Sequence, residues 1–324
     1  MSLSNRDTDV AGPSLLALGR WVLGAPENLP ISEERHQSLR DAMHGIRTIL
    51  SFEDKFAMII DNLVEFEFGL LRVSAIHSVR PFQTHGDFFG QKRDLNRHLT
   101  NLLSTTRQYL DQNHKHIEPL LGGTEVSFKK RTNDEYDGSL AYRTMELLRN
   151  YVQHRDLGVH IMTVDGSWID IEDEEKKKLR NRTTAFLDLD HLSIGGDLSK
   201  KELGVIEDLR GCPHQPDIPL LTREYVAAVA RIHKSVRKAL KPTVDTWKAI
   251  VGKAIDDYSA AFPGVDVVGL SVMWRHPDRT GTKLLDVFPE PMDRLEAVQK
   301  INWCPTNLGR EYVSSEYVPT KWKK

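Results

Sequence analysis

Residues 95–110 read LNRHLTNLLSTTRQYL, and this stretch decides the fold class. Its leucines recur at spacings of three and four residues, which is the period of one face of an α-helix. The other face carries basic residues, Arg97 and Arg107 within the stretch and Arg93 just before it. The stretch therefore predicts an amphipathic helix with one buried face and one solvated face.

Further helical segments follow the same pattern, each bounded by a break. A helix that opens at Ser32 has an N-cap residue followed by acidic residues in its first turn. Pro81–Gly90 is expected to be a loop and Lys129–Asp134 a connection. Pro242 is expected to separate two helices, because proline lacks the N–H that a helix interior needs. The other expected helices cover residues 14–23, 52–79, 137–153, 225–240 and 244–262.

Short strands are expected after the middle of the chain. The acidic-then-basic run Glu172–Arg182 is expected to be solvated and to separate the first two strands, and Pro277–Gly281 is expected to form the turn of a later hairpin. The expected strands cover residues 161–171, 184–189, 265–275 and 284–288. The predicted fold class is thus mainly α, a helical bundle with a few short strands.

Three parts are expected along the chain. Residues 1–29 form a lead segment with a polar, frayed start, and residues 30–240 form the helical domain. Residues 241–324 form a small C-terminal appendage of helices and α+β structure.

Composition is that of an ordinary globular protein. The 324 residues are 40% hydrophobic and 28% charged, which suits one large core or two modest ones. The formal net charge of −2 argues against a nucleic-acid binder that works through a global basic field. Any contact with RNA must therefore come from a local patch.

The expected location is the cytoplasm, with no membrane association. No run approaches the roughly 20 apolar residues of a membrane span, and the start lacks the apolar segment of a signal peptide. Cys212 and Cys304 are too few for a disulfide framework, which fits a reducing compartment. Cys212 lies close to His214, but no second Cys/His pair has zinc spacing, so no metal site is expected.

Residues 147–154, LLRNYVQH, carry the candidate chemistry. Asn150 and His154 stand four positions apart and share a helix face, whereas Arg149 lies about 100° around the helix from Asn150. Arg149 and His154 lie roughly 140° apart, so one chain presents them over a wide arc. A second copy of the helix, related by a two-fold axis, would close that arc, and we therefore expect a homodimer.

An Arg followed by Asn and then, four to six residues after the Arg, by His is the signature of HEPN ribonucleases. Arg149-Asn150-x-x-x-His154 resembles the short form of this signature, on a late helix preceded by long apolar helices. The resemblance covers residues 30–240. It implies an endoribonuclease without metal or cofactor, with Arg149, Asn150 and His154 as catalytic residues, and the biology of a toxin or a phage-defence effector.

These residue types suit RNA cleavage. Histidine passes protons at neutral pH, so His154 could activate a ribose 2′-hydroxyl or protonate the leaving 5′-oxygen. The Arg149 guanidinium offers a fork of donors to the scissile phosphate, and Asn150 would orient His154 or the phosphate. Since the nucleophile belongs to the substrate, RNA is the expected substrate and DNA should be refused.

Other hypotheses stay open. A non-catalytic helical protein could use the same cleft to hold RNA or a partner, or the protein could be a toxin regulated by a nucleotidyltransferase-type antitoxin. Each residue also has a purely structural explanation. Arg149 could form a surface salt bridge, and His154 could interact favourably with the dipole at the C-terminus of its helix. His160 is a further candidate contact, with a structural role preferred.

Overall fold

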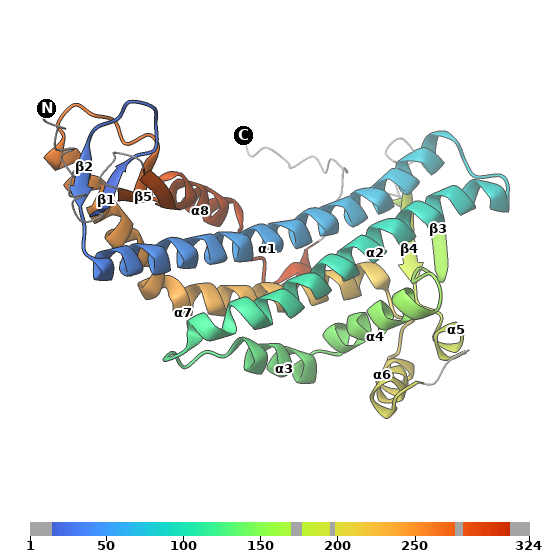
Figure 1. Cartoon of the computed structure of the whole chain (residues 1–324). Helices are drawn as coiled ribbons and strands as arrows, with labels where there is room; N and C mark the ends of the chain where they lie inside the picture. Colours follow the sequence, from blue (N-terminus) through green and yellow to red (C-terminus); the bar gives the residue numbers. More distant parts are fainter. Residues whose placement is uncertain (1–14, 170–176, 195–197, 276–280, 312–324) are drawn as a thin grey trace, which may run out of the picture. The chain divides into compact units, whose positions relative to one another are not determined.

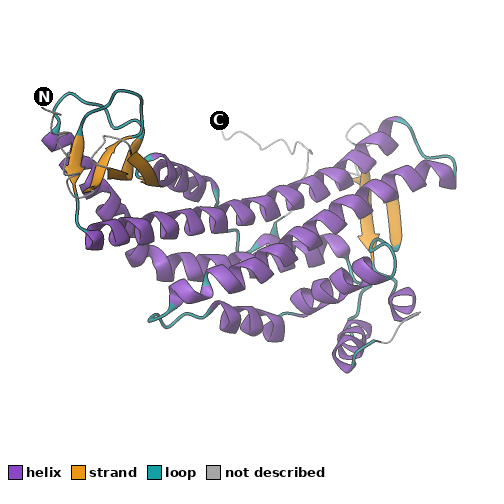
Figure 2. Cartoon of the chain, in the orientation of Figure 1, coloured by secondary structure: helices purple, strands orange, loops and turns teal. Residues whose placement is uncertain are grey.

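The chain is mainly helical, as its sequence predicts (Figures 1 and 2). The computed structural model describes residues 15–169, 177–194, 198–275 and 281–311. Two compact units divide the chain, one from residues 1–53 and 240–301 and the other from residues 54–239 and 302–324. The long helices α1 (Glu33–Val79) and α7 (Ile218–Ala261) contribute to both units.

The larger unit, residues 54–239 and 302–324, has a helical core. In it α2 (His85–His116) lies beside α4 (Leu140–His154), with the later part of α1 and the earlier part of α7 (Figure 1). Each of these helices buries a large side chain completely: Phe66, Tyr109, Tyr142 and Tyr225. The short elements of this unit between α2 and α4 and near the C-terminus are η1 (Glu118–Leu121), α3 (Phe128–Gly138) and η2 (Leu308–Arg310).

The amphipathic helix expected over residues 95–110 is confirmed as part of α2. The leucines of its apolar face are at most 5% exposed: Leu95, Leu99, Leu102, Leu103 and Leu110. On the other side, Arg93 and Arg97 are exposed. Full burial of one leucine contributes about 1.5–3 kcal/mol, so this stripe holds α2 in the unit.

An antiparallel ribbon follows α4. It consists of β3 (Ile161–Ile169) and β4 (Lys178–Phe186), and is followed by α5 (Leu189–Ser193) and α6 (Lys200–Arg210). The second strand starts earlier than the expected residues 184–189, so the basic end of the Glu172–Arg182 run belongs to a strand. The acidic part of that run lies outside the described residues.

The smaller unit, residues 1–53 and 240–301, contains an antiparallel four-stranded sheet in the order β2-β1-β5-β6. Its strands are β1 (Leu15–Arg20), β2 (Asn28–Pro30), β5 (Leu270–Arg275) and β6 (Gly281–Asp286), and α8 (Glu290–Ile301) follows them. The expected C-terminal hairpin is confirmed, although its first strand begins at Leu270 rather than at residue 265 and its second covers Gly281–Asp286 rather than residues 284–288. Most of its turn lies outside the described residues.

The prediction of a helix over residues 14–23 is wrong, because Leu15–Arg20 is the strand β1. Its register with β5 runs from Leu15 opposite Arg275 to Arg20 opposite Leu270. Leu16, Ala17 and Leu18 are all buried, and a short apolar run of this kind fits a buried strand as well as a helix. The polar start of the expected lead segment, residues 1–14, lies outside the described residues.

Two expected breaks do not exist. α1 is one helix from Glu33 to Val79, because buried Ile49, Phe52 and Phe56 continue one apolar face across the expected boundary at residue 52. α7 likewise passes through Pro242 without ending.

Caps explain three other differences in helix boundaries. α2 begins inside the expected loop Pro81–Gly90, because Thr84 and Asp87 form a capping box. Lys129–Asp134 is helical rather than a connection, because the Ser127 hydroxyl accepts a hydrogen bond from the Lys130 N–H and starts α3. The helix expected over residues 137–153 is confirmed as α4, which begins at Leu140 because Ser139 caps it, and residues 137–138 are the end of α3.

None of the helices within the described ranges is long and apolar enough to span a bilayer.

Candidate functional site

Helix α4 carries the three candidate residues. Ser139 caps its N-terminus by accepting a hydrogen bond from the Tyr142 N–H, and Arg155 is its C-cap residue. Gly158 follows, and a Cβ there would lie 3.0 Å from side-chain atoms of Leu99 and Val152. A larger residue at position 158 would therefore crowd the end of α4 and Leu99 of α2.

A pocket of about 310 Å³ lies at the C-terminal end of α4. It is lined by Leu147, Asn150, Tyr151, His154, Arg155, Leu198 and Glu202. Asn150 and His154 share this pocket, as their four-residue spacing predicts. Arg149 does not line it.

His154 is the last residue of α4 and is exposed. Its imidazole has no hydrogen-bond or ion-pair partner in the described part of the chain. Both ring nitrogens are therefore available to a bound substrate.

Asn150 is tied to α6. Its amide donates a hydrogen bond of 3.3 Å to Oε1 of Glu202, whose Oε2 accepts bonds from the N–H and hydroxyl of Ser199 in the capping box of α6. Burial alone would raise the pKa of Glu202, but the hydrogen bonds from Ser199 and Asn150 and the charge of Arg155 bring it below the ordinary value. Glu202 is thus held as a carboxylate beside Asn150.

Arg149 turns toward a different set of groups. Its Nη1 donates a hydrogen bond of 2.8 Å to Oε1 of Gln153, and its Nη2 lies 3.8 Å from Oε2 of Glu146. Its Nε is buried without a hydrogen-bond partner among the described residues. One chain therefore does not bring Arg149 and His154 into one pocket.

Glu146 is the centre of this second set. Its Oε1 accepts a 2.6 Å hydrogen bond from the hydroxyl of the fully buried Tyr225, and its Oε2 also lies 3.5 Å from Nη1 of Arg107. Burial and the nearby Glu146 charge raise the pKa of Tyr225 well above its ordinary value. Arg149 thus shares its carboxylate with Arg107 and Tyr225.

Arg155 and Glu202 line the pocket but were missed in the sequence. Arg155 immediately follows the Arg-Asn-x-x-x-His pattern, and its position as the C-cap residue was not visible from spacing. Glu202 had a detectable signal, because Ser199 and Glu202 have the spacing of a capping box. Its contact with Asn150 depends on tertiary structure.

The ring of Tyr151 contacts a cluster formed with the imidazoles of His160 and His191. The centroid of its ring is 5.2 Å from that of His160, and the rings of His160 and His191 are 4.9 Å apart. His160 Nδ1 accepts a hydrogen bond from the Asp188 N–H, and burial followed by the charge of His191 lowers the pKa of His160. The position of His160 agrees with the structural role preferred for it.

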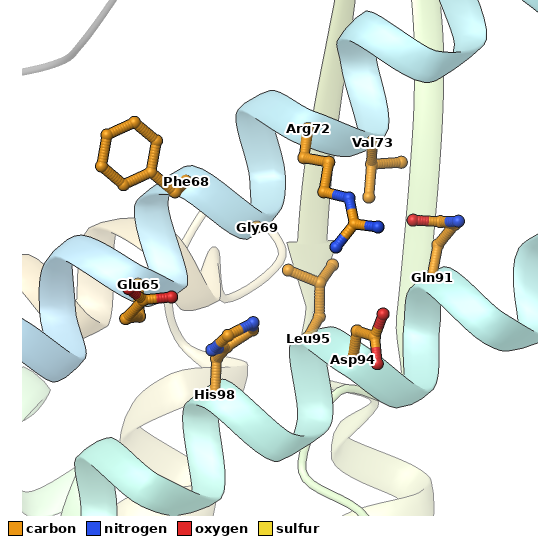
Figure 3. A pocket seen from close by; sticks show the side chains of 9 residues that line it. All are labelled: Glu65, Phe68, Gly69, Arg72, Val73, Gln91, Asp94, Leu95 and His98. Carbon is orange, nitrogen blue, oxygen red and sulfur yellow. The ribbon is translucent and has the colours of Figure 1, made fainter.

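A second pocket, of about 200 Å³, lies between α1 and α2 (Figure 3). The side chains of Arg72 on α1 and Asp94 on α2 extend toward one another there, with Phe68 at its edge. Gly69 permits the close approach of the helices, because a Cβ there would lie 2.9 Å from Leu95. None of the residues predicted for the site belongs to this pocket.

Within the described ranges, no group of three or more His, Cys, Asp or Glu residues is arranged to hold a metal ion. Neither Cys212 nor Cys304 forms a disulfide bond in the described part of the chain.

Comparison of the chain with protein-family models, with curated proteins and with solved structures found no match. Any assignment of the site therefore rests on its own geometry and chemistry.

Proposed function

We propose that the protein is a metal-independent endoribonuclease of HEPN type whose site lies at the C-terminal end of α4. The observation that carries this proposal is the shared pocket of Asn150 and His154, in which the exposed imidazole has no partner among the described residues. A histidine with free ring nitrogens in an open pocket is suited to proton transfer to a bound substrate.

The reaction is attack of a ribose 2′-oxygen on the adjacent phosphorus. The 2′-hydroxyl proton goes to a base, the bond from phosphorus to the 5′-oxygen breaks, and an acid protonates that oxygen. The products are a 2′,3′-cyclic phosphate and a 5′-hydroxyl. His154 acts in these proton transfers, and Asn150 positions the imidazole or the phosphate.

Two proton transfers favour two imidazoles, and each pocket contains one His154. In the proposal a homodimer brings two copies of α4 together, so that one His154 is the base and the other the acid. An intracellular toxin or defence effector, restrained by an antitoxin or another regulatory partner, is the biology that this activity suits.

The test is cleavage of a labelled RNA by the purified protein in EDTA. Replacing His154 by Ala should lower the rate by about 100-fold or more, the scale of general acid–base catalysis. His116→Ala is the matched control, because His116 is also an exposed histidine at the last residue of a helix. A DNA strand of the same sequence should remain intact.

Cleavage by His154→Ala at the rate of the unchanged protein would reject the proposal. So would loss of cleavage in EDTA that added divalent metal restores.

A second candidate is a non-catalytic protein that holds RNA or a partner in the same cleft. The observation that favours it is the engagement of Arg149 by Gln153 and Glu146, which leaves that guanidinium outside the pocket. RNA binding without cleavage, by both the unchanged protein and His154→Ala, would support this candidate.

A further inference from the structure

Arg155 has an unusual environment for a surface arginine. It lines the pocket beside Asn150 and His154, and its Nη1 is buried with no hydrogen-bond partner among the described residues. The other guanidinium nitrogens have no hydrogen bond or ion pair in that part of the chain either. A buried donor without an acceptor is costly, which is why such groups usually mark a place for a water or a ligand.

Arg155 forms no ion pair with Glu202. Glu202 lines the same pocket, but its oxygens accept hydrogen bonds from Asn150 and Ser199, and it lies beyond ion-pair distance of Arg155. Arg155 therefore lines the pocket without an ion pair in the described part of the chain.

The helix end makes such a cation necessary. The last carbonyl groups of α4 carry partial negative charge, which repels a phosphate and favours a positive side chain. Arg155 is the C-cap residue of α4, so its guanidinium lies where this repulsion must be offset before an anion can bind next to His154.

Arg149 also has one buried nitrogen, Nε, without a hydrogen-bond partner among the described residues, but its other contacts and its position differ from those of Arg155. Gln153 and Glu146 occupy two of its nitrogens, its side chain is 15% exposed, and it does not line the pocket. Its role in the structure is to neutralise Glu146 together with Arg107.

We propose that Arg155, rather than Arg149, binds the phosphate in the α4 pocket, with Asn150 and His154 beside it. The inference rests on the proposed function in taking that phosphate to be part of an RNA strand. The guanidinium fork supplies two parallel donors to the phosphate oxygens. Arg149 has a structural role, as an ion-pair partner of Glu146 outside the pocket.

The experiment measures binding of a fully 2′-O-methylated oligoribonucleotide, which cannot be cleaved by 2′-hydroxyl attack. Fluorescence anisotropy at several salt concentrations gives the affinity and its salt slope. Arg155→Ala should weaken binding about tenfold or more and reduce the salt slope by about one. Arg155→Lys should keep the salt slope and lose part of the affinity, because lysine retains the charge without the fork.

Two variants serve as comparisons. Arg149→Ala should keep the salt slope of the unchanged protein and lower the midpoint of thermal unfolding, since it removes one partner of Glu146. Arg210→Ala removes one exposed arginine that is ion-paired with Asp190 outside the pocket, and should change neither quantity appreciably.

The inference is overturned if a folded Arg155→Ala or Arg155→Lys protein binds as the unchanged protein does, or if only Arg149→Ala loses the salt slope. Absence of oligonucleotide binding by the unchanged protein also overturns it. Cleavage is measured separately. An Arg155-dependent binder that never cleaves RNA would remove the proposed function alone, and a cleaving enzyme indifferent to Arg155 would remove the inference alone.

Discussion

At the scale of single residues, two buried tyrosines near the candidate site differ by one hydrogen bond. Tyr142 on α4 and Tyr225 on α7 are both fully buried, and their rings meet edge to face at 5.1 Å. The Tyr225 hydroxyl donates to Glu146, whereas the Tyr142 hydroxyl has no partner in the described structure. Removing the hydroxyl oxygen should therefore change the free energy of unfolding differently at the two positions.

Tyr225→Phe should lower the free energy of unfolding by about 2 kcal/mol, because it removes a hydrogen bond to a carboxylate. Tyr142→Phe should change it by about 0.5 kcal/mol or less, or raise it, because it removes a buried hydroxyl without a partner. Urea unfolding of both variants measures this difference. Equal losses would show that ring packing, rather than the bond to Glu146, determines the effect.

The sequence predicted part of the site at this scale. A spacing of four residues is enough to place Asn150 and His154 on one face, because the helix fixes the angle between them. The spacing could not show that Arg149 is hydrogen-bonded to Gln153 and ion-paired with Glu146. The rotamer of a side chain depends on its neighbours, and Glu146 is hydrogen-bonded to Tyr225 from another helix. Arg155 was missed for a similar reason. It is a candidate phosphate ligand because its guanidinium lacks an ion pair among the described residues of the pocket, and the sequence does not show which charged groups pair in the folded chain.

At the scale of secondary-structure elements, α7 contains an internal proline. Pro242 cannot donate a backbone hydrogen bond to the carbonyl of Lys238, one turn earlier, and yet the helix continues to Ala261. Buried Val236, Leu240 and Val244 lie at spacings of four around it, so packing of the apolar face outweighs the lost bond.

Pro242→Ala should therefore raise the free energy of unfolding, by about 2 kcal/mol, since the helix regains a donor but the unfolded chain becomes more flexible. Pro119→Ala is the control, because Pro119 lies in the first turn of η1, where a helix needs no donor. Pro119→Ala should lower the free energy of unfolding by about 0.5 kcal/mol, because the unfolded chain becomes more flexible. Thermal or urea unfolding measures both, and a Pro242→Ala protein less stable than its parent would contradict the prediction.

Elements held by local periodicity were predictable, whereas those that depend on distant partners were not. The leucine spacing of residues 95–110 is sufficient for α2, because each turn of a helix is bonded to the next. β1 is a strand because β2 and β5 pair with it, and the sequence of Leu15–Arg20 does not by itself identify those partners. The prediction that Pro242 separates two helices was wrong for the same reason, because packing of the apolar face outweighs the preference of proline to end a helix.

At the scale of the whole molecule, the proposed site needs two copies of the chain. Each chain contributes one His154, and the proposed reaction uses two. Ribonuclease activity should then depend on the fraction of dimers in which both chains carry His154.

Co-expression of unchanged and His154→Ala chains tests this dependence. With half of the chains unchanged and random pairing, a composite site should leave about a quarter of the activity, because only one dimer in four carries two imidazoles. Independent sites would leave half. Light scattering of the same samples should show a dimer, and a strict monomer that cleaves RNA would contradict the two-chain site.

The pairing of β1 with β5 sets an order of events during protein synthesis. Leu15–Arg20 leaves the ribosome before its neighbour Leu270–Arg275, with residues 21–269 made between them. Residues 54–239 are complete before then, so most of the larger unit can fold while translation continues. Until β5 is made, the apolar segment Leu15–Gly19 has an unpaired strand edge, which a chaperone would have to shield from other chains.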